Sequence, residues 1–332
     1  MRVRQLPTKR TPRFVRLGAL VVAGSVLAGL LSACAGAAGA PVSSPARSPG
    51  AVSHPSATAS PSGLQAVQLA SSPTRIKAEG GALANAGTMQ LLWSRGLNTE
   101  RPMGSITKVM TALVVIDSGD LNREIRIPKA VLEYVAKYQG ESAGLRPGDE
   151  LTARQLLEAL LLQSACDAAY VLAVTYGPGM PAFLAKMNAM AAKLGMTHTH
   201  FASPDGLPYP TEYSTYSTPA DLLTLGLAAM KLPLFRSIVD QPFYHVTKLK
   251  GVRHSYWFDN TNELISTYQG AVGIKDGYTD AAKHCLLFEA VRHGVTLIGV
   301  VLGSPVTEPF TADQAATRLL DWGFAQKFAT SG

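Results

Sequence analysis

The chain has 332 residues, 47% of them hydrophobic and 16% charged, so it is long enough to bury the core of one large domain or two small ones. Its formal net charge is +7, but six of the 30 Lys and Arg residues precede Cys34, and the rest of the chain is nearly neutral. A nearly neutral body offers no basic stripe to follow a phosphate backbone, which excludes nucleic acid as a partner.

The first 34 residues have the pattern of an export signal. A basic stretch precedes an apolar run from Leu17 to Leu31 that is too short to span a membrane comfortably. The following Ser32-Ala33-Cys34 completes a match to the bacterial lipobox, whose cysteine thiol accepts a diacylglyceryl group. We expect residues 1–33 to be removed and Cys34 to anchor the protein by lipid at the extracytoplasmic face of the cell membrane. Ordinary cleavage nearby, giving a secreted protein, is the alternative.

Residues 35–73 consist mainly of Ala, Ser, Pro and Gly. Such a segment cannot bury enough apolar surface to offset its ordering entropy, so it is predicted to be a disordered linker. The remaining residues, 74–328, are predicted to form one domain.

The domain is predicted to begin with a hairpin and a helix. Residues 80–84 and 88–94 flank Asn85-Ala86-Gly87, a turn sequence typical of antiparallel strands. Apolar residues then recur at helical spacing before Gly119, where the chain can turn away: Ile106, Val109, Met110 and Leu113.

Further helices are predicted in the middle of the chain. Thr152-Ala153-Arg154-Gln155 is a capping box before a leucine-rich helix that is expected to end near Gln163. A second helix is expected around Phe183 to Met190. Thr218-Pro219 predicts the start of a third, because proline is favoured in the first turn.

The last third of the domain is predicted to form strands. Residues 273–278, 284–291 and 295–302 are rich in strand-forming residues and are joined by short loops. A helix over residues 311–328, opened by a second Thr-x-x-Gln cap, closes the chain. This order predicts an α+β fold whose sheet joins both ends of the chain.

Ser105-Ile106-Thr107-Lys108 is the clearest chemical signal. Residues three apart on a helix share a face, and a lysine that loses its proton can activate a serine hydroxyl as a nucleophile. The start of a helix also offers backbone N–H groups to a developing oxyanion. Alone, however, the Ser-x-x-Lys pattern is common, and a solvated helix face is its simpler interpretation.

Five ordered blocks change that interpretation, because together they resemble the serine D-alanyl-D-alanine carboxypeptidase family, the low-molecular-mass penicillin-binding proteins. The blocks cover essentially the whole domain: Ser105–Thr111, Gly144–Asp149, Ser164–Ala169, Ser203–Leu207 and Gly273–Thr279. The resemblance implies a fold of the serine DD-peptidase and β-lactamase type. Its five-stranded antiparallel sheet packs with helices and a helical subdomain, with the site between them.

The resemblance also implies a role for each site residue. Ser105 would attack the bond between the last two D-alanines of a peptidoglycan stem peptide, Lys108 would be its base, and Ser164 would relay a proton to the leaving group. Lys275 would supply positive charge, and the backbone N–H groups of Ser105 and Tyr278 would form an oxyanion hole. β-Lactams would acylate Ser105 as substrate mimics, and no cofactor or metal is implied.

Two substrate-binding positions depart from the family pattern. Cys166 stands where asparagine is usual and offers only a weak donor with no amide carbonyl. Asp276, between Lys275 and Gly277, stands where a threonine or serine hydroxyl usually binds the substrate carboxylate. An ionised aspartate would repel that carboxylate and could pair with Lys275. A homologue that binds wall peptide or β-lactam without efficient turnover is therefore the alternative function.

A third function, that of a β-lactamase, would need a base for deacylation. No Glu-x-x-Leu-Asn pattern follows Ser164 to provide one, so this option ranks last.

The remaining candidate residues receive structural interpretations. Cys166 and Cys285 could form a disulfide in an exported protein, but two free, buried thiols are the expectation. His198 and His200 lack a third ligand at a familiar spacing, which favours a polar loop over a zinc site.

Overall fold

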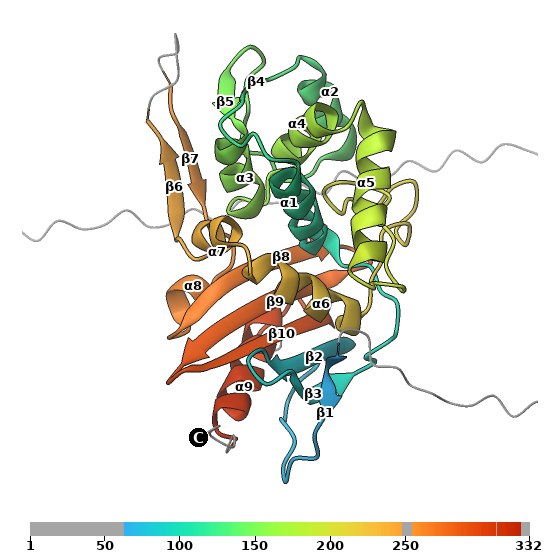
Figure 1. The fold of residues 1–332 in the computed structure, drawn as a ribbon, viewed down its shortest axis with the longest axis vertical. Helices are drawn as coiled ribbons and strands as arrows, with labels where there is room; N and C mark the ends of the chain where they lie inside the picture. The colour runs from blue at the N-terminus through green and yellow to red at the C-terminus, as the bar shows by residue number, and fades with distance from the viewer. Residues whose placement is uncertain (1–62, 248–253, 310, 327–332) are drawn as a thin grey trace, which may run out of the picture. The chain divides into compact units, whose positions relative to one another are not determined.

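The computed structural model describes residues 63–247, 254–309 and 311–326. The predicted signal, Cys34 and most of the predicted linker lie outside these residues. The elements it describes are arranged as an α+β fold, in which one central sheet packs with helices on both faces (Figure 1).

The sheet has the strand order β1-β3-β2-β10-β9-β8. Its strands are β1 (Gln65–Ala66), β2 (Gly80–Asn85), β3 (Gln90–Arg95), β8 (Ala271–Thr279), β9 (Lys283–Arg292) and β10 (Val295–Ser304). The five longer strands are antiparallel neighbours, which confirms the predicted five-stranded sheet and its joining of both ends of the domain.

The two-residue strand β1 is an addition that the sequence analysis did not predict. It pairs in parallel with β3, and the neighbouring Leu64 is buried. Placing the end of the linker at residue 73 was therefore wrong, because residues 64–66 already contribute to the domain. A short strand at a sheet edge carries too little hydrophobic pattern to be recognised in an Ala- and Ser-rich context.

Both faces of the sheet are buried because apolar side chains of the central strands point to opposite sides. On one face, Leu83 and Phe288 pack with Leu319 and Leu320 of α9. On the other, Leu287 and residues of β10 pack in the larger core with α1 and α6. Figure 1 shows α9 and α6 on opposite faces of the sheet.

Helices precede, separate and follow the strands of the central sheet. They are α1 (Thr107–Ser118), α2 (Ala130–Tyr138), α3 (Ala153–Leu161), α4 (Cys166–Tyr176), α5 (Met180–Lys193), α6 (Pro219–Met230), α7 (Pro233–Val239), α8 (Leu264–Thr267) and α9 (Ala312–Phe324). The predicted helix starts are confirmed at Thr152, Thr218 and Thr311, whose side chains each accept a bond from a backbone N–H in the first helical turn.

Two small hairpins complete the fold: β4 (Glu124–Arg126) with β5 (Glu150–Thr152), and β6 (Phe243–Val246) with β7 (Tyr256–Asp259). Among the described residues no single helix is long and apolar enough to cross a membrane, although two bent helix pairs reach that length and composition together.

Three segments from distant parts of the sequence meet beside the sheet. They are the 3₁₀ turn η2 (Gly104–Ile106) that leads into α1, the connection between α3 and α4, and the strand β8 at the sheet edge. Each carries residues that the sequence analysis selected, so the fold brings the candidate site together.

Candidate active site

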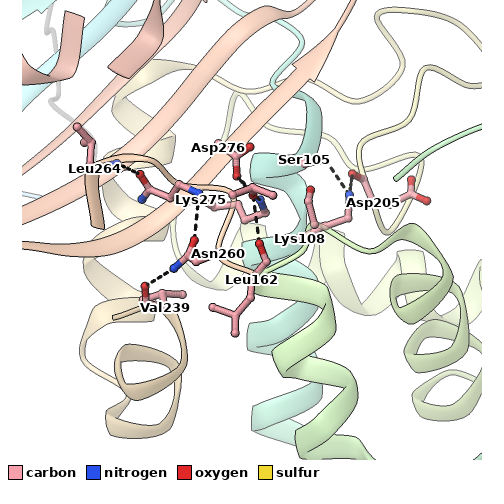
Figure 2. Close-up of polar contacts among 12 residues, drawn as sticks. Ser105, Lys108, Leu162, Asp205, Val239, Asn260, Leu264, Lys275 and Asp276 are labelled. Carbon is pink, nitrogen blue, oxygen red and sulfur yellow. Dashed lines mark hydrogen bonds and ion pairs between the residues drawn. The ribbon is translucent and has the colours of Figure 1, made fainter. Parts of the chain in front are cut away.

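Ser105 and Lys108 lie one helical turn apart at the junction of η2 and α1. The Lys108 ammonium group donates a hydrogen bond to Ser105 Oγ over 2.7 Å (Figure 2). Lys108 is fully buried, whereas Ser105 is partly exposed and lines a cleft. The pair therefore presents a hydroxyl to the cleft with an amine directly behind it, which is the arrangement a lysine-activated nucleophile requires.

The remaining bonds of Lys108 fix its position. Its Nζ also donates to the backbone carbonyl of Asp205 over 3.0 Å and to Cys166 Sγ over 3.4 Å. The Asp205 carboxylate in turn accepts a bond from Tyr134 Oη over 2.6 Å, and the hydroxyl groups of Tyr134 and Tyr209 lie 2.7 Å apart. This network holds the 203–207 loop against α1 and points the Asp205 carbonyl at Lys108.

Ser164 lies in the connection between α3 and α4, and Cys166 is the first residue of α4. Ser164 is buried and has a left-handed backbone conformation with φ of +58°, which is uncommon for a residue with a side chain and typical of functional sites. The Cys166 N–H donates to the Glu141 carbonyl over 2.7 Å, which ties this turn to the far wall of the cleft. Both residues line the cleft together with Ser105.

Cys166 is a neutral thiol in this environment. Burial raises its pKa to about 12, although the nearby Lys108 charge acts in the opposite direction. The side chain replaces the usual amide with a weak acceptor that still contacts Lys108. Since the thiolate is the nucleophilic form of cysteine, Cys166 does not compete with Ser105 as nucleophile.

Strand β8 approaches the nucleophile through two glycines. A Cβ atom on Gly277 would lie 2.8 Å from the Ser105 backbone nitrogen, and one on Gly104 would lie 2.9 Å from the Tyr278 backbone nitrogen. Side chains at these positions would push the two segments apart. The backbone nitrogens of Ser105 and Tyr278 are thereby held close together, as an oxyanion hole requires.

Lys275 and Asp276 form an ion pair on the same strand, which confirms the pairing that the sequence analysis considered (Figure 2). Lys275 is fully buried, and Thr261 Oγ1 donates to Asp276 Oδ1 over 2.7 Å. Burial lowers the pKa of Lys275, with the Asp276 charge opposing this effect. For Asp276, burial acts to raise the pKa, but the charge and bond of Lys275 and the Thr261 bond outweigh it, so the pKa is lowered.

These elements surround a cleft of ≈ 360 Å³, the size of a small-molecule site. Of the predicted site residues, Ser105, Ser164, Cys166, Asp276, Gly277 and Tyr278 line it. Lys108 and Lys275 lie behind its wall, each bonded to a lining residue. The predicted catalytic and substrate-binding residues therefore come together at one place, while Cys34 lies outside the described residues.

The two histidines and Cys285, for which the sequence predicted no catalytic role, do not line the cleft. His198 contacts Glu100, and His200 contacts the Ser214 carbonyl, so the two histidines have separate partners. Among the described residues, no group of three or more His, Cys, Asp and Glu side chains could hold a metal ion. Cys285 is a free, buried thiol like Cys166, as expected.

Three functional positions were missed by the sequence analysis. Thr261 follows β7 and bonds both Lys275 and Asp276, but nothing in its sequence context marks it. Tyr134 supports Asp205 from α2, a helix that was not predicted. The Glu141 carbonyl acts through the backbone and so leaves no side-chain signal.

Comparison with known proteins agrees with this geometry. A family model described as D-alanyl-D-alanine carboxypeptidase matches residues 66–306. The D-alanyl-D-alanine carboxypeptidase of Streptomyces sp. strain K15 is 42% identical over 75% of this chain and 88% of its own length. The D-alanyl-D-alanine carboxypeptidase DacB2 of Mycobacterium tuberculosis is 41% identical, over 73% of this chain and 81% of its own.

A solved structure of the same family is similar to this chain. The crystal structure of the Streptomyces K15 DD-transpeptidase matches with a TM-score of 0.71 and 39% identity, covering 77% of this chain and 100% of that chain. The predicted fold of the serine DD-peptidase type is confirmed by this likeness.

Proposed function

This chain belongs to the D-alanyl-D-alanine carboxypeptidase family, as a serine-type enzyme, and on this premise we propose which of its residues carry the reaction on peptidoglycan stem peptides. The single observation that carries the assignment is the 2.7 Å contact between Lys108 Nζ and Ser105 Oγ at the wall of the cleft. Because the relatives are named as carboxypeptidases and a transpeptidase, the alternative of binding without turnover is not favoured.

In the first step, Ser105 Oγ attacks the carbonyl carbon of the penultimate D-alanine. Lys108, when uncharged, accepts the hydroxyl proton across the 2.7 Å contact. Negative charge develops on the carbonyl oxygen, where the backbone N–H groups of Ser105 and Tyr278 stabilise it. The two glycines that let β8 approach η2 are the structural basis of that oxyanion hole.

In the second step, the peptide nitrogen leaves with a proton and an acyl-enzyme remains on Ser105. Ser164 lines the cleft beside Ser105 and Cys166, where it can pass the proton from Lys108 to the leaving nitrogen. Water then hydrolyses the ester, or an amine accepts the acyl group. A β-lactam enters the same first step, but its cleaved amide remains attached to the acyl group.

Acylation by a β-lactam tests this assignment. The full chain is incubated with saturating benzylpenicillin, beside Ser105→Ala, and each intact mass is measured. We expect one benzylpenicilloyl adduct on the wild type and none on the variant. A folded wild type that gains no adduct would refute the assignment of Ser105 as nucleophile.

We also propose that the enzyme acts outside the cytoplasmic membrane, anchored by lipid on Cys34. The support is the lipobox-like Leu31–Cys34 after an apolar run, together with a substrate class that lies outside the cell membrane. The intact mass of protein extracted from membranes checks this: we expect a chain that begins at Cys34 and carries acyl chains. A chain that begins after Cys34, without lipid, would contradict the proposal.

A further inference from the structure

Asp276 leaves one of its carboxylate oxygens open. Its ion pair with Lys275 and its bond from Thr261 both use Oδ1. Among the described residues, no side chain forms a hydrogen bond or ion pair with the second oxygen, Oδ2. The side chain is 35% exposed and lines the cleft that also contains Ser105. A second acceptor oxygen of an ionised carboxylate is therefore available in the cleft that contains the nucleophile.

The surface of the cleft is acidic. Four of the residues that line it are carboxylates, namely Glu141, Glu212, Asp276 and Asp280. No Lys or Arg is among them. Lys108 and Lys275, which are bonded to lining residues, are buried, and each already has an acceptor: Lys108 bonds the Asp205 carbonyl, and Lys275 pairs with Asp276. The described lining of the cleft thus offers no Lys or Arg side chain to an anionic ligand.

An acidic subsite of this kind is unsuited to the free carboxylate of a terminal D-alanine. Two carboxylates at contact distance repel, and such a like-charge contact costs several kcal/mol in general. A carboxamide has nearly the same shape as a carboxylate, but its NH₂ group donates hydrogen bonds. It can therefore occupy the same space and donate to Asp276 Oδ2.

We propose that Asp276 makes this enzyme selective for peptides whose leaving residue carries a carboxamide in place of a free carboxylate. This inference rests on the proposed function, since it concerns the leaving-group side of the same reaction. The low pKa of Asp276 supports it, because the carboxylate stays ionised at neutral pH.

The reaction balances with water alone. Ser105 Oγ forms an ester with the acyl carbonyl carbon as the C–N bond to the leaving residue breaks, and the hydroxyl proton ends on the leaving nitrogen. For a peptide ending in D-alanyl-D-alaninamide, D-alaninamide departs as the amine. Hydrolysis of the ester then restores Ser105 and gives a peptide that ends in D-alanine.

The test compares two substrates that differ only at the terminal group. An Nα-acylated tripeptide ending in D-alanyl-D-alanine and the same peptide ending in D-alanyl-D-alaninamide are incubated with the full chain. Mass spectrometry measures the release of D-alanine or D-alaninamide and so gives kcat/KM for each. We expect the wild type to prefer the amide by at least about tenfold, which corresponds to one repulsive contact of modest strength.

Variants assign the preference to Asp276. Asp276→Thr restores the hydroxyl usual in the family and is expected to shift the kcat/KM ratio towards the acid by at least about tenfold. Asp276→Asn keeps the shape without the charge and should improve cleavage of the acid while retaining cleavage of the amide. Glu124→Gln, which removes an exposed carboxylate on β4 that does not line the cleft, should keep the wild-type order of preference.

The outcomes separate this inference from the function on which it rests. A wild type that cleaves the acid as well as or better than the amide overturns the inference, as does a ratio unchanged in both Asp276 variants. An uncharged D-alanyl thioester serves as an independent acyl donor for Ser105. If the thioester acylates Ser105 but the enzyme does not prefer the amide peptide over the acid peptide, only the proposed selectivity is wrong. If neither the thioester nor benzylpenicillin acylates the folded protein, the proposed function fails as well.

Discussion

Gly206 shows how closely single residues constrain the site. It lies in the 203–207 loop with φ of +84°, and a Cβ atom there would lie 1.9 Å from the Gly104 carbonyl oxygen. Gly104 directly precedes the nucleophile. The loop that supplies the Asp205 carbonyl to Lys108 therefore packs backbone to backbone against the turn that carries Ser105.

Gly206→Ala is expected to disable the enzyme. The added methyl group must move either the 203–207 loop or η2, and displacements of about 1 Å in a catalytic geometry cost about 100-fold in rate. We expect the acylation rate of Ser105 by benzylpenicillin, followed by intact mass over time, to fall by at least that factor. Stability should fall by about 2–5 kcal/mol from combined strain and overpacking.

Gly195→Ala is the matched control. Gly195 also has a positive φ, of +77°, but a Cβ atom there would meet nothing within 4 Å. We expect a stability loss of about 1–2 kcal/mol from the backbone conformation alone, with normal acylation. Equal acylation rates in the two variants would show that the contact with Gly104 does not position Ser105.

At the residue scale, the motifs in the sequence located side chains that the fold brings to one cleft. Ser105, Lys108, Ser164 and Cys166 were selected because they match ordered blocks, and the pairing of Asp276 with Lys275 followed from their opposite charges. Thr261 was not predictable in this way. It reaches Asp276 only because the chain after β7 returns beside β8, which is a property of the tertiary structure.

At the scale of elements, Glu158 links α3 to the chain that follows α7. It is buried on α3, accepts a hydrogen bond from Gln241 and has Arg154 Nε at 3.9 Å from Oε1. Burial raises its pKa to about 7, although Arg154 and Gln241 act in the opposite direction. The folded chain therefore holds this proton more tightly than the unfolded chain, whose carboxyl has its ordinary pKa of 4.5.

This shift predicts a pH-dependent effect of Glu158→Gln. Below about pH 4.5 the carboxyl is protonated in both states, so the variant and the wild type should be equally stable. As the pH rises to about 7, the unfolded wild type releases its proton first and the wild type loses stability. Above pH 7 the variant, which can still accept the Gln241 bond, should be more stable by on the order of 3 kcal/mol.

Urea unfolding of both proteins at several pH values measures this difference. Other titrating groups are common to both chains, so the difference between the two curves reports Glu158. A difference that does not change with pH, or a wild type that is more stable than the variant at pH 8, would contradict the assigned shift.

Element prediction depended on local signals. The capping boxes at Thr152 and Thr311 and the Thr218-Pro219 start each identified the first turn of a helix. By contrast, α4 begins at Cys166 after Ala165, which provides no side-chain cap, and the helix is buried along most of its length. It therefore shows neither a start signal nor a helical period. The β6–β7 hairpin was missed for a different reason, because its strands are separated by a long connection with no short turn sequence.

At the scale of the whole molecule, the sequence order of strands and helices predicted the architecture. A hairpin at the start of the domain and three strands at its end can share one sheet only if the end of the chain comes back beside the hairpin. The antiparallel pairing of β10 with β2 shows that it does. The linker boundary was wrong because β1 adds to the sheet through two residues. Its pairing depends on β3 being in place and could not be seen locally.

The close approach of β8 to η2 also links catalysis to folding kinetics. The nucleophile lies near the start of the domain, whereas Gly277 and Tyr278 lie close to its end, so the oxyanion hole is a long-range contact with no local precursor. A chain still emerging during synthesis has its serine and lysine but lacks the strand that would stabilise charge. Capacity for acylation therefore arises only once β8 has joined η2, and covalent labelling by a β-lactam also reports that this long-range pairing has formed.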